Sequence, residues 1–329
     1  MKNNFRLIAF LVTAFAGLAN LDGQDVYRIT VAQDGTGDYK TIMQAIDAAR
    51  SFPDKRITIF VKNGTYNEKV VVPAHNPKIS MIGESVEKTV ITFGDFFNKM
   101  NRGRNSTFYT YTMLVDADDF YVENLTIVNS AGPVGQAVAL HVRGDRCVFR
   151  NCRILGHQDT LYTDGFCSRQ YFENCFIEGT TDFIFGASTV LFSHCTINSK
   201  GNSYVTAAST PEGKPFGYVF LDCRLTADSG VTKAFLGRPW RDFARVVFIR
   251  CELGAHIDPA GWQNWSGTGR DKTAYYAEYG NTGKGSDLSK RVPWSHKLTS
   301  DEASIYTLEN ILKPVALVEK PATEWIKDK

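Results

Sequence analysis

The sequence predicts an all-β protein in which successive strands stack as a single parallel β-helix. The main observation is a repeat around the cysteines. Five similar strand-like segments, such as V-F-R-N-C-R-I, have a cysteine at the same place, and a sixth has leucine there; the aligned positions are Leu125, Cys152, Cys175, Cys195, Cys223 and Cys251. Their spacings are 27, 23, 20, 28 and 28 residues. A unit of this length with one alternating strand cannot bury its own apolar face, so it must stack on its neighbours.

The segments between these strands support the same fold. They contain no helical pattern long enough for a βαβ crossover, which argues against an α/β barrel or a Rossmann sheet. In a stack of parallel coils the cysteines form an inward row, where cysteine ordinarily acts as a small core hydrophobe. Equivalent residues on adjacent coils lie about 4.8 Å apart, within the range of a disulfide. A bridge between Cys175 and Cys195 is therefore an open alternative in an exported protein.

Both ends of the repeat region carry helix signals. Thr41 and Gln44 form a capping-box pattern at the start of one apolar run, and Thr299 and Glu302 form another near the C-terminus. We expect short helices that cover the open ends of the coil, where unpaired strand edges would otherwise invite association.

The N-terminus has the parts of a secretory signal peptide. A short basic region precedes about a dozen apolar residues, and small residues follow at Gly17 and Ala19. The rival interpretation is a membrane anchor, but the apolar run is shorter than the ~20 residues of a span, and no later segment could span. A lipoprotein anchor is not expected either, because no cysteine lies near this end to carry the lipid. We expect residues 1–19 to be removed, with cleavage no later than about residue 24, and the protein to be exported to the periplasm or the extracellular space.

The bulk composition is that of a globular protein. Of 329 residues, 43% are apolar and 22% charged. No linker divides the chain, so we expect residues 25–329 to form one β-helical catalytic domain. Lys2 and Arg6 lie in the signal region, and the other 35 basic residues balance 35 acidic ones. With no basic run or zinc-finger spacing, nucleic acid is not an expected partner. The six histidines lack ligand spacing, so we expect no metal site.

Two aspartates occupy equivalent places in the repeat. Asp159 lies seven residues after Cys152, and Asp182 lies seven residues after Cys175. On consecutive coils their Cα atoms should be roughly 5 Å apart. Two carboxyl groups this close cannot both ionise cheaply, so one pKa should rise and give one acid and one carboxylate. Arg238, whose position Pro239 helps to fix, is a cation that could decide which aspartate is the acid and which is the carboxylate.

The aspartate pair alone does not choose the reaction. A single loop aspartate is most often a turn or cap, but two in register favour a site. Retaining glycosidases also use carboxyl groups about 5 Å apart. Acyl transfer additionally needs donors to an oxyanion, and the amides of Gln158 and Gln136 are candidates. Gln136 lies 23 residues before Asp159, which predicts a third member of the row. The chain has no G-x-S-x-G, so no serine elbow is present.

Several motifs in order resemble those of the pectin methylesterases, carbohydrate esterases with a right-handed parallel β-helix of the pectin-lyase-like type. The resemblance runs from about Val31 to Leu312 and is carried by D-G-T-G-D-Y-K-T-I (34–42), G-T-Y-N-E (64–68), Q-A-V-A-L (136–140), G-H-Q-D-T-L-Y (156–162), D-F-I-F-G (182–186), L-G-R-P-W (236–240), P-A-G-W-Q-N-W (259–265) and Y-A-E-Y-G-N-T-G (276–283). One block is weak by itself, but four signature blocks in the right order are specific.

The resemblance implies a role for each catalytic candidate. Asp182 would be the nucleophile that attacks the C6 methyl ester of a galacturonate residue. Gln136 and Gln158 would stabilise the oxyanion. Asp159 would give its proton to methanol and then act as base for the hydrolytic water. Arg238 would orient Asp182 and keep it ionised.

The resemblance also implies how substrate is held. Trp240, Tyr162, Phe185 and Thr107 would line the groove for methyl-esterified pectin. The protein is expected to be a monomer without a cofactor. His157 receives no catalytic step. One departure from the family is D-A-D-D-F (116–120), in place of a glycine-rich turn, which puts in doubt only the local geometry of that loop.

Two other classes of function remain as alternatives. A pectin depolymerase could use the same coil, but the N-T-D and R-I-K patterns of polygalacturonases are missing, and no acidic cluster for a calcium-dependent lyase is apparent. A non-enzymatic sugar-binding module would have no need for the two aspartates, two glutamines and arginine together.

Overall fold

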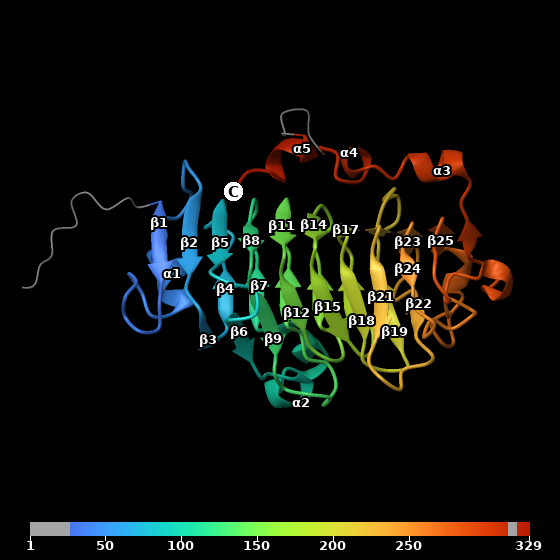
Figure 1. The fold of residues 1–329 in the computed structure, drawn as a ribbon, viewed down its shortest axis with the longest axis horizontal. Helices are drawn as coiled ribbons and strands as arrows, with labels where there is room; N and C mark the ends of the chain where they lie inside the picture. Colours follow the sequence, from blue (N-terminus) through green and yellow to red (C-terminus); the bar gives the residue numbers. More distant parts are fainter. Residues whose placement is uncertain (1–26, 315–320) are drawn as a thin grey trace, which may run out of the picture.

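The computed structural model describes residues 27–314 and 321–329. The predicted signal peptide lies outside these residues. All the named strands pair in parallel and form three sheets that run side by side along the molecule (Figure 1). The predicted parallel β-helix is confirmed. No helix among the described residues is long and apolar enough to cross a membrane.

The three sheets are continuous along the coil. The largest has eleven strands, in the order β1 (Arg28–Val31), β2 (Ile57–Val61), β5 (Ile79–Gly83), β8 (Tyr121–Glu123), β11 (Cys147–Arg150), β14 (Arg169–Glu173), β17 (Thr189–Ser193), β20 (Tyr218–Leu221), β23 (Arg245–Ile249), β25 (Tyr275–Tyr279) and β26 (His296–Lys297). The second has eight, β3 (Gly64–Asn67), β6 (Thr89–Phe93), β9 (Thr126–Asn129), β12 (Arg153–Leu155), β15 (Phe176–Gly179), β18 (Thr196–Ser199), β21 (Arg224–Ala227) and β24 (Glu252–Leu253). The third has seven, β4 (Val70–Val72), β7 (Met113–Val115), β10 (Leu140–Val142), β13 (Leu161–Thr163), β16 (Ile184–Gly186), β19 (Tyr204–Ala208) and β22 (Phe235–Gly237).

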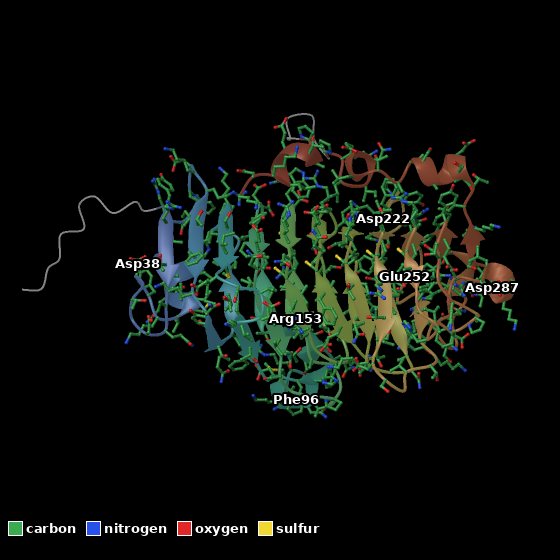
Figure 2. All side chains as sticks on the ribbon, viewed as in Figure 1. Asp38, Phe96, Arg153, Asp222, Glu252 and Asp287 are labelled. Carbon is green, nitrogen blue, oxygen red and sulfur yellow. The ribbon has the colours of Figure 1, made fainter. Side chains whose placement is uncertain are left out.

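The strand register confirms the cysteine repeat. Arg153, which follows Cys152, pairs with Thr126 on one side and Phe176 on the other. A tight turn between the eleven- and eight-stranded sheets recurs just before each aligned position. The turn residue has a φ between 48° and 61° in each of these six coils; the residues are Asn124, Asn151, Asn174, His194, Asp222 and Arg250. Asparagine and aspartate tolerate this left-handed conformation better than most residues do, which explains the polar residue before each cysteine. In Figure 2 the labelled Arg153, Asp222 and Glu252 project from the coils.

The interior of the coil is filled by stacked aromatic rings. Phe149, Phe172, Phe192, Phe220 and Phe248 are fully buried, one on each of five consecutive strands of the eleven-stranded sheet. Successive ring centroids lie 4.5, 5.1, 4.5 and 4.3 Å apart. Because identical side chains in register stack on one another, each coil supplies a binding surface for the next one.

The cysteine row is buried but carries no disulfide, which corrects the suggested bridge. Cys175 and Cys195 are both free thiols. The Sγ atom of Cys175 lies 3.4 Å from the carbonyl oxygen of Phe149 on the preceding coil, and that of Cys195 lies 3.5 Å from the carbonyl oxygen of Phe172. The thiols are thus directed at backbone acceptors of the preceding coil, and they act as small core residues.

The helix signals are confirmed, but only one helix has the expected place. Helix α1 (Ile42–Ala48) has the capping box of Thr41 and Gln44 and buries Ile42, Ala45 and Ile46 at the N-terminal end of the core. Helix α3 (Ser300–Ser304) has the capping box of Thr299 and Glu302. It begins a C-terminal segment that runs back along the outside of the eleven-stranded sheet, with α4 (Leu308–Ile311) and α5 (Ala322–Trp325), instead of covering the open end (Figure 1).

The C-terminal segment covers an apolar outer face of this sheet. Ile311, Leu312, Trp325 and Ile326 are buried against an outward row of sheet residues that includes Tyr121, Val148, Tyr171, Leu191 and Val247. Exposing this apolar row to water would be unfavourable. This explains why the segment packs along the sheet instead of covering the C-terminal end of the coil.

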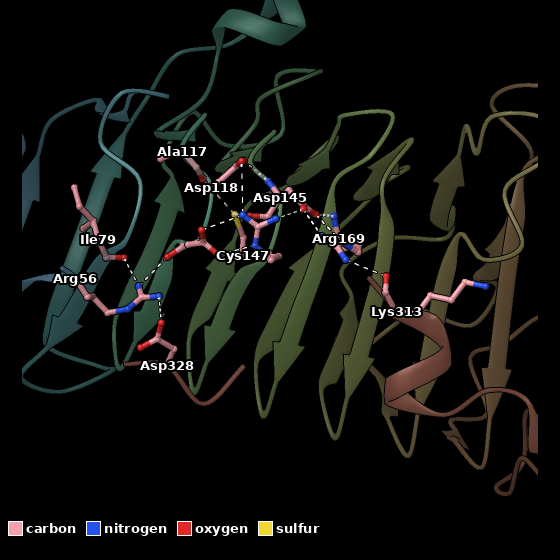
Figure 3. Close-up of polar contacts among 11 residues, drawn as sticks. Arg56, Ile79, Ala117, Asp118, Asp145, Cys147, Arg169, Lys313 and Asp328 are labelled. Atoms are coloured by element: carbon pink, nitrogen blue, oxygen red, sulfur yellow. Dashed lines mark hydrogen bonds and ion pairs between the residues drawn. The ribbon is translucent and has the colours of Figure 1, made fainter. Parts of the chain in front are cut away.

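Polar contacts fix both halves of this segment to the coils (Figure 3). Arg169 donates to the carbonyl oxygen of Lys313 at 2.9 Å, and Arg56 is paired with Asp328 at 3.3 Å. Asp119 of the 116–120 loop belongs to the same surface: it is paired with Arg146 at 2.6 Å, and its carbonyl accepts from Arg56 at 2.7 Å.

The remaining short helices lie outside the sheets. They are α2 (Phe97–Met100), η1 (Gly103–Tyr109), η2 (Arg270–Lys272) and η3 (Leu288–Lys290). Of these, η1 contributes side chains to the cavity described below.

The free cysteine row makes a countable prediction. Cys167 is exposed and the other six cysteines are buried. A thiol reagent should therefore modify one cysteine in the native protein and all seven in protein unfolded without reductant. Intact-mass measurement after alkylation gives both counts. If two fewer thiols were modified in the unfolded protein, a disulfide would be present and the free-thiol assignment would be wrong.

Candidate active site

Asp159 and Asp182 occupy the same position on consecutive coils, as predicted. Leu161 pairs with Ile184, so each aspartate lies two residues before its strand in the seven-stranded sheet. Their backbones are left-handed, with φ of 64° and 50°. The amide of Asp159 donates to the carbonyl of Thr181 at 3.1 Å, and that of Asp182 donates to the carbonyl of Tyr204 at 2.8 Å. The strained conformation is thus fixed on each coil by the next one.

A single arginine distinguishes the two carboxyl groups. Arg238 follows β22 and binds Asp182 through two hydrogen bonds, Nε to Oδ1 at 2.9 Å and Nη2 to Oδ2 at 2.6 Å. This bidentate arrangement is the strong form of an arginine–carboxylate pair. Asp159 makes no ion pair with a described residue.

The electrostatic environment therefore orders the two pKa values. Asp159 is 8% exposed and Asp182 is 6% exposed. Burial and then the charge of Asp182 raise the pKa of Asp159 well above its usual range. Burial also raises the pKa of Asp182, but the hydrogen bonds and charge of Arg238 oppose that rise. Asp159 accordingly retains its proton to higher pH than Asp182 does.

The carboxyl groups open into a cavity of about 330 Å³ with an aromatic wall. Its lining residues are Arg104, Thr107, Phe108, Gln136, Gln158, Asp159, Asp182, Phe185, Ala207, Arg238, Trp240 and Trp265. The structure thus brings together all five predicted catalytic residues. It also brings in three of the four predicted substrate contacts, namely Thr107, Phe185 and Trp240.

The register predicted for Gln136 is wrong, although the residue does reach the cavity. Gln136 pairs with Gln158, not with Asp159, and the following strand places Leu140 opposite Leu161. The offset between these coils is therefore shorter than the 23 residues expected. The result is two half-buried amide side chains on neighbouring coils next to the carboxyl pair.

Tyr162 lies beside the cavity instead of lining it. Its ring stacks on Phe185 with centroids 4.5 Å apart and contacts Phe108 at 5.1 Å. It lines an adjoining cavity of about 380 Å³ together with His141 and Arg143. The predicted substrate contact is therefore a support for Phe185 within this cavity and a wall of the next one.

Four lining residues were not assigned from the sequence: Arg104, Phe108, Ala207 and Trp265. Trp265 ends the motif P-A-G-W-Q-N-W, and Phe108 adjoins Thr107, so the sequence offered a reason to consider both as lining residues. Ala207 follows from strand register, because it pairs with Phe185. Nothing in the sequence singles out Arg104.

His157 does not line the cavity and orders the turn through its backbone. Its carbonyl oxygen accepts from the Thr160 hydroxyl at 3.0 Å and from the Thr180 amide at 2.9 Å. Burial lowers the pKa of its imidazole. Within the described ranges, no group of three histidine, cysteine, aspartate or glutamate side chains is arranged to hold a metal ion.

Comparison with known proteins identifies the family of the chain. A family model described as Pectinesterase matches residues 28–314. Pectinesterase 31 of Arabidopsis thaliana is 40% identical over 294 residues, which are 87% of this chain and 92% of that protein. The solved structure of pectin methylesterase from carrot has a TM-score of 0.82 and 35% identity, with 89% of this chain and 94% of that chain covered.

Some relatives are much longer. The probable pectinesterase/pectinesterase inhibitor 23 of Arabidopsis thaliana is 41% identical over 298 residues, which are 86% of this chain but 52% of that protein. The chain thus spans about half the length of such relatives. On its sequence, its fold and these matches, the chain belongs to the pectinesterase family.

Proposed function

We propose that the protein is a pectin methylesterase, which hydrolyses C6 methyl esters of homogalacturonan to galacturonate carboxylates and methanol. The observation that carries the proposal is the unequal aspartate pair. Arg238 binds Asp182 in bidentate fashion, while Asp159 is buried beside it without a cation of its own. The pair therefore supplies one carboxylate and one carboxylic acid in a single cavity.

In the first half-reaction the Asp182 carboxylate attacks the ester carbonyl carbon. The carbonyl oxygen becomes an oxyanion, which the side-chain amides of Gln136 and Gln158 stabilise as donors. Collapse of this intermediate breaks the bond to the methoxy oxygen, and Asp159 transfers its proton to that oxygen. Methanol leaves, and the acyl group remains on Asp182 as an anhydride.

In the second half-reaction Asp159 is a carboxylate and accepts a proton from water. The water oxygen attacks the acyl carbon, and the bond to Asp182 breaks. The product acid leaves, Asp182 is again a carboxylate held by Arg238, and Asp159 is again protonated. No cofactor takes part in this scheme.

The lining of the cavity favours ester hydrolysis over glycoside cleavage. A retaining glycosidase would also use two carboxyl groups, but it has no need for two amides beside the nucleophile. Phe185 and Trp240 offer apolar ring surfaces for sugar rings, and their centroids are 5.8 Å apart. Methyl-esterified pectin is therefore the proposed partner, and the protein is proposed to act as a monomer.

Export completes the proposal, because pectin is a cell-wall polymer. The basic, apolar and small-residue regions of residues 1–19 support a signal peptide, with the mature enzyme in the periplasm or the extracellular space.

The nucleophile is tested with Asp182→Asn. Methanol release from highly methylated pectin should fall at least about 10³-fold, because an amide cannot form the acyl intermediate. A matched control is Asp222→Asn: Asp222 also has a left-handed backbone and is bound by an arginine, Arg250, through two hydrogen bonds of 2.8 Å, but it does not line the cavity. Equal activity of the two variants would reject Asp182 as nucleophile. Unchanged viscosity of the pectin separates esterase from depolymerase activity.

The order of the pKa values predicts a bell-shaped pH dependence of kcat. Activity requires ionised Asp182 and protonated Asp159, so the acid limb reports the first and the alkaline limb the second. In Asp159→Asn, kcat should fall about 10²- to 10⁴-fold. An unchanged alkaline limb in this variant would contradict the assignment.

The same burial predicts that Asp159 costs stability at high pH. Its pKa is higher in the folded than in the unfolded protein, so the folded state binds more protons and stability falls as pH rises between the two values. Asp159→Asn should melt at a higher temperature than the parent near neutral pH, and this difference should shrink as the pH falls toward 4. A difference independent of pH would show that Asp159 is not the buried titrating group.

A further inference from the structure

The guanidinium that binds Asp182 lies over two aromatic rings. The Arg238 Cζ atom is 4.0 Å from the ring centroid of Tyr204 and 4.1 Å from that of Trp265. Trp265 also lines the active-site cavity, whereas Tyr204 begins strand β19 on the coil after Asp182. Neither residue has a step in the proposed reaction, so their contact with the arginine needs another explanation.

Tyr204 touches both partners of the Asp182–Arg238 pair. Its carbonyl oxygen accepts the hydrogen bond from the Asp182 amide at 2.8 Å, and its ring covers the arginine. The ring itself is held from two sides. Its hydroxyl donates to the side-chain oxygen of Gln263, and its face stacks on Phe235, with centroids 5.5 Å apart and an interplanar angle of 23°. Tyr204 is thus placed to fix both the backbone of Asp182 and the orientation of Arg238.

Such a support answers a problem that this reaction creates. Hydrolysis produces a carboxylate inside the cavity, and partly de-esterified pectin carries others. A guanidinium binds any of them in the bidentate manner in which it binds Asp182. The Arg238 side chain is 21% exposed, so the ion pair is within reach of such competitors. Aromatic rings over the guanidinium restrict its rotation and add cation–π attraction.

We propose that Tyr204 is a positioning residue for the esterase reaction and that, together with Trp265, it holds Arg238 on Asp182. This inference rests on the proposed function. Its chemical consequence is that the carboxylate of Asp182 stays ionised and aimed at the ester while carboxylate groups of the polymer pass through the same cavity.

The experiment compares Tyr204→Leu with Tyr204→Phe in the full-length mature enzyme. The phenylalanine variant keeps the ring, and its kcat should stay within about twofold of the parent. The leucine variant loses the ring, and its kcat should fall about 5- to 30-fold, the range expected for a cation–π contact of 1–2 kcal/mol, with KM nearly unchanged. Its acid limb should move to higher pH, because a looser arginine opposes the burial of Asp182 less.

The matched control is Tyr275→Leu. Tyr275 covers Arg245 at 4.7 Å on the eleven-stranded sheet, so its loss removes a similar contact outside the cavity. This control should keep the parental kcat and acid limb. Circular dichroism checks the fold of each variant, and Trp265→Leu against Trp265→Phe repeats the test from the other ring if Tyr204→Leu does not fold.

Two results would overturn the inference: a folded Tyr204→Leu enzyme with the parental kcat and acid limb, or a Tyr204→Phe enzyme that loses as much activity as Tyr204→Leu. The second would show that the hydroxyl, not the ring, matters. Failure of the proposed function has a different signature, because the parent would then release no methanol or Asp182→Asn would remain active.

Discussion

Parallel pairing of each strand with the equivalent strand of the next coil is the constraint on which this structure depends. It stacks Phe149 on Phe172 in the interior and aligns the cysteines beneath the turns. It also places Asp159 beside Asp182 on the outer side of the coils, at the floor of the cavity. A shift of one residue would turn every side chain of a strand to the opposite face. A change that shifts the strand register would therefore disrupt both the core and the site, because one register determines both.

The site owes its chemistry to asymmetry between two similar residues. Both aspartates are buried, both have a left-handed backbone and both line the same cavity. Only Asp182 is bound by Arg238. A single cation thus divides the pair into an acid and a carboxylate, and the position of that cation becomes the sensitive variable. The aromatic rings of Tyr204 and Trp265 act on that variable without contacting the reacting ester.

Much of this was readable in the sequence, since repeat spacing translates directly into stacking. The equal distance from Cys152 to Asp159 and from Cys175 to Asp182 predicted the pair correctly. The same reasoning failed for Gln136, because the segment between β9 and β10 has a different length and breaks the count. It also could not place Tyr204 against Arg238, since that contact depends on the side-chain directions of the first residue of β19 and of the residue after β22.

The C-terminal segment and the cysteines show a second limit. The capping box at Thr299 was visible, but the sheet face that the segment covers was not, because outward residues such as Tyr121 and Val148 are as apolar as inward ones. The spacing of Cys175 and Cys195 permitted a disulfide, yet spacing does not determine where a thiol points. In both cases the sequence predicted the coil register but not the direction of the side chains.

The proposed mechanism requires that Asp159 holds a proton while Asp182 is ionised, and infrared difference spectroscopy can detect that proton. The parent and Asp159→Asn would be compared at the pH of maximal activity. If Asp159 carries the proton, the parent should show a carbonyl band of a protonated carboxylic acid that is missing from the variant. If that band persists in Asp159→Asn, the proton resides on another carboxyl group and Asp159 is not the acid.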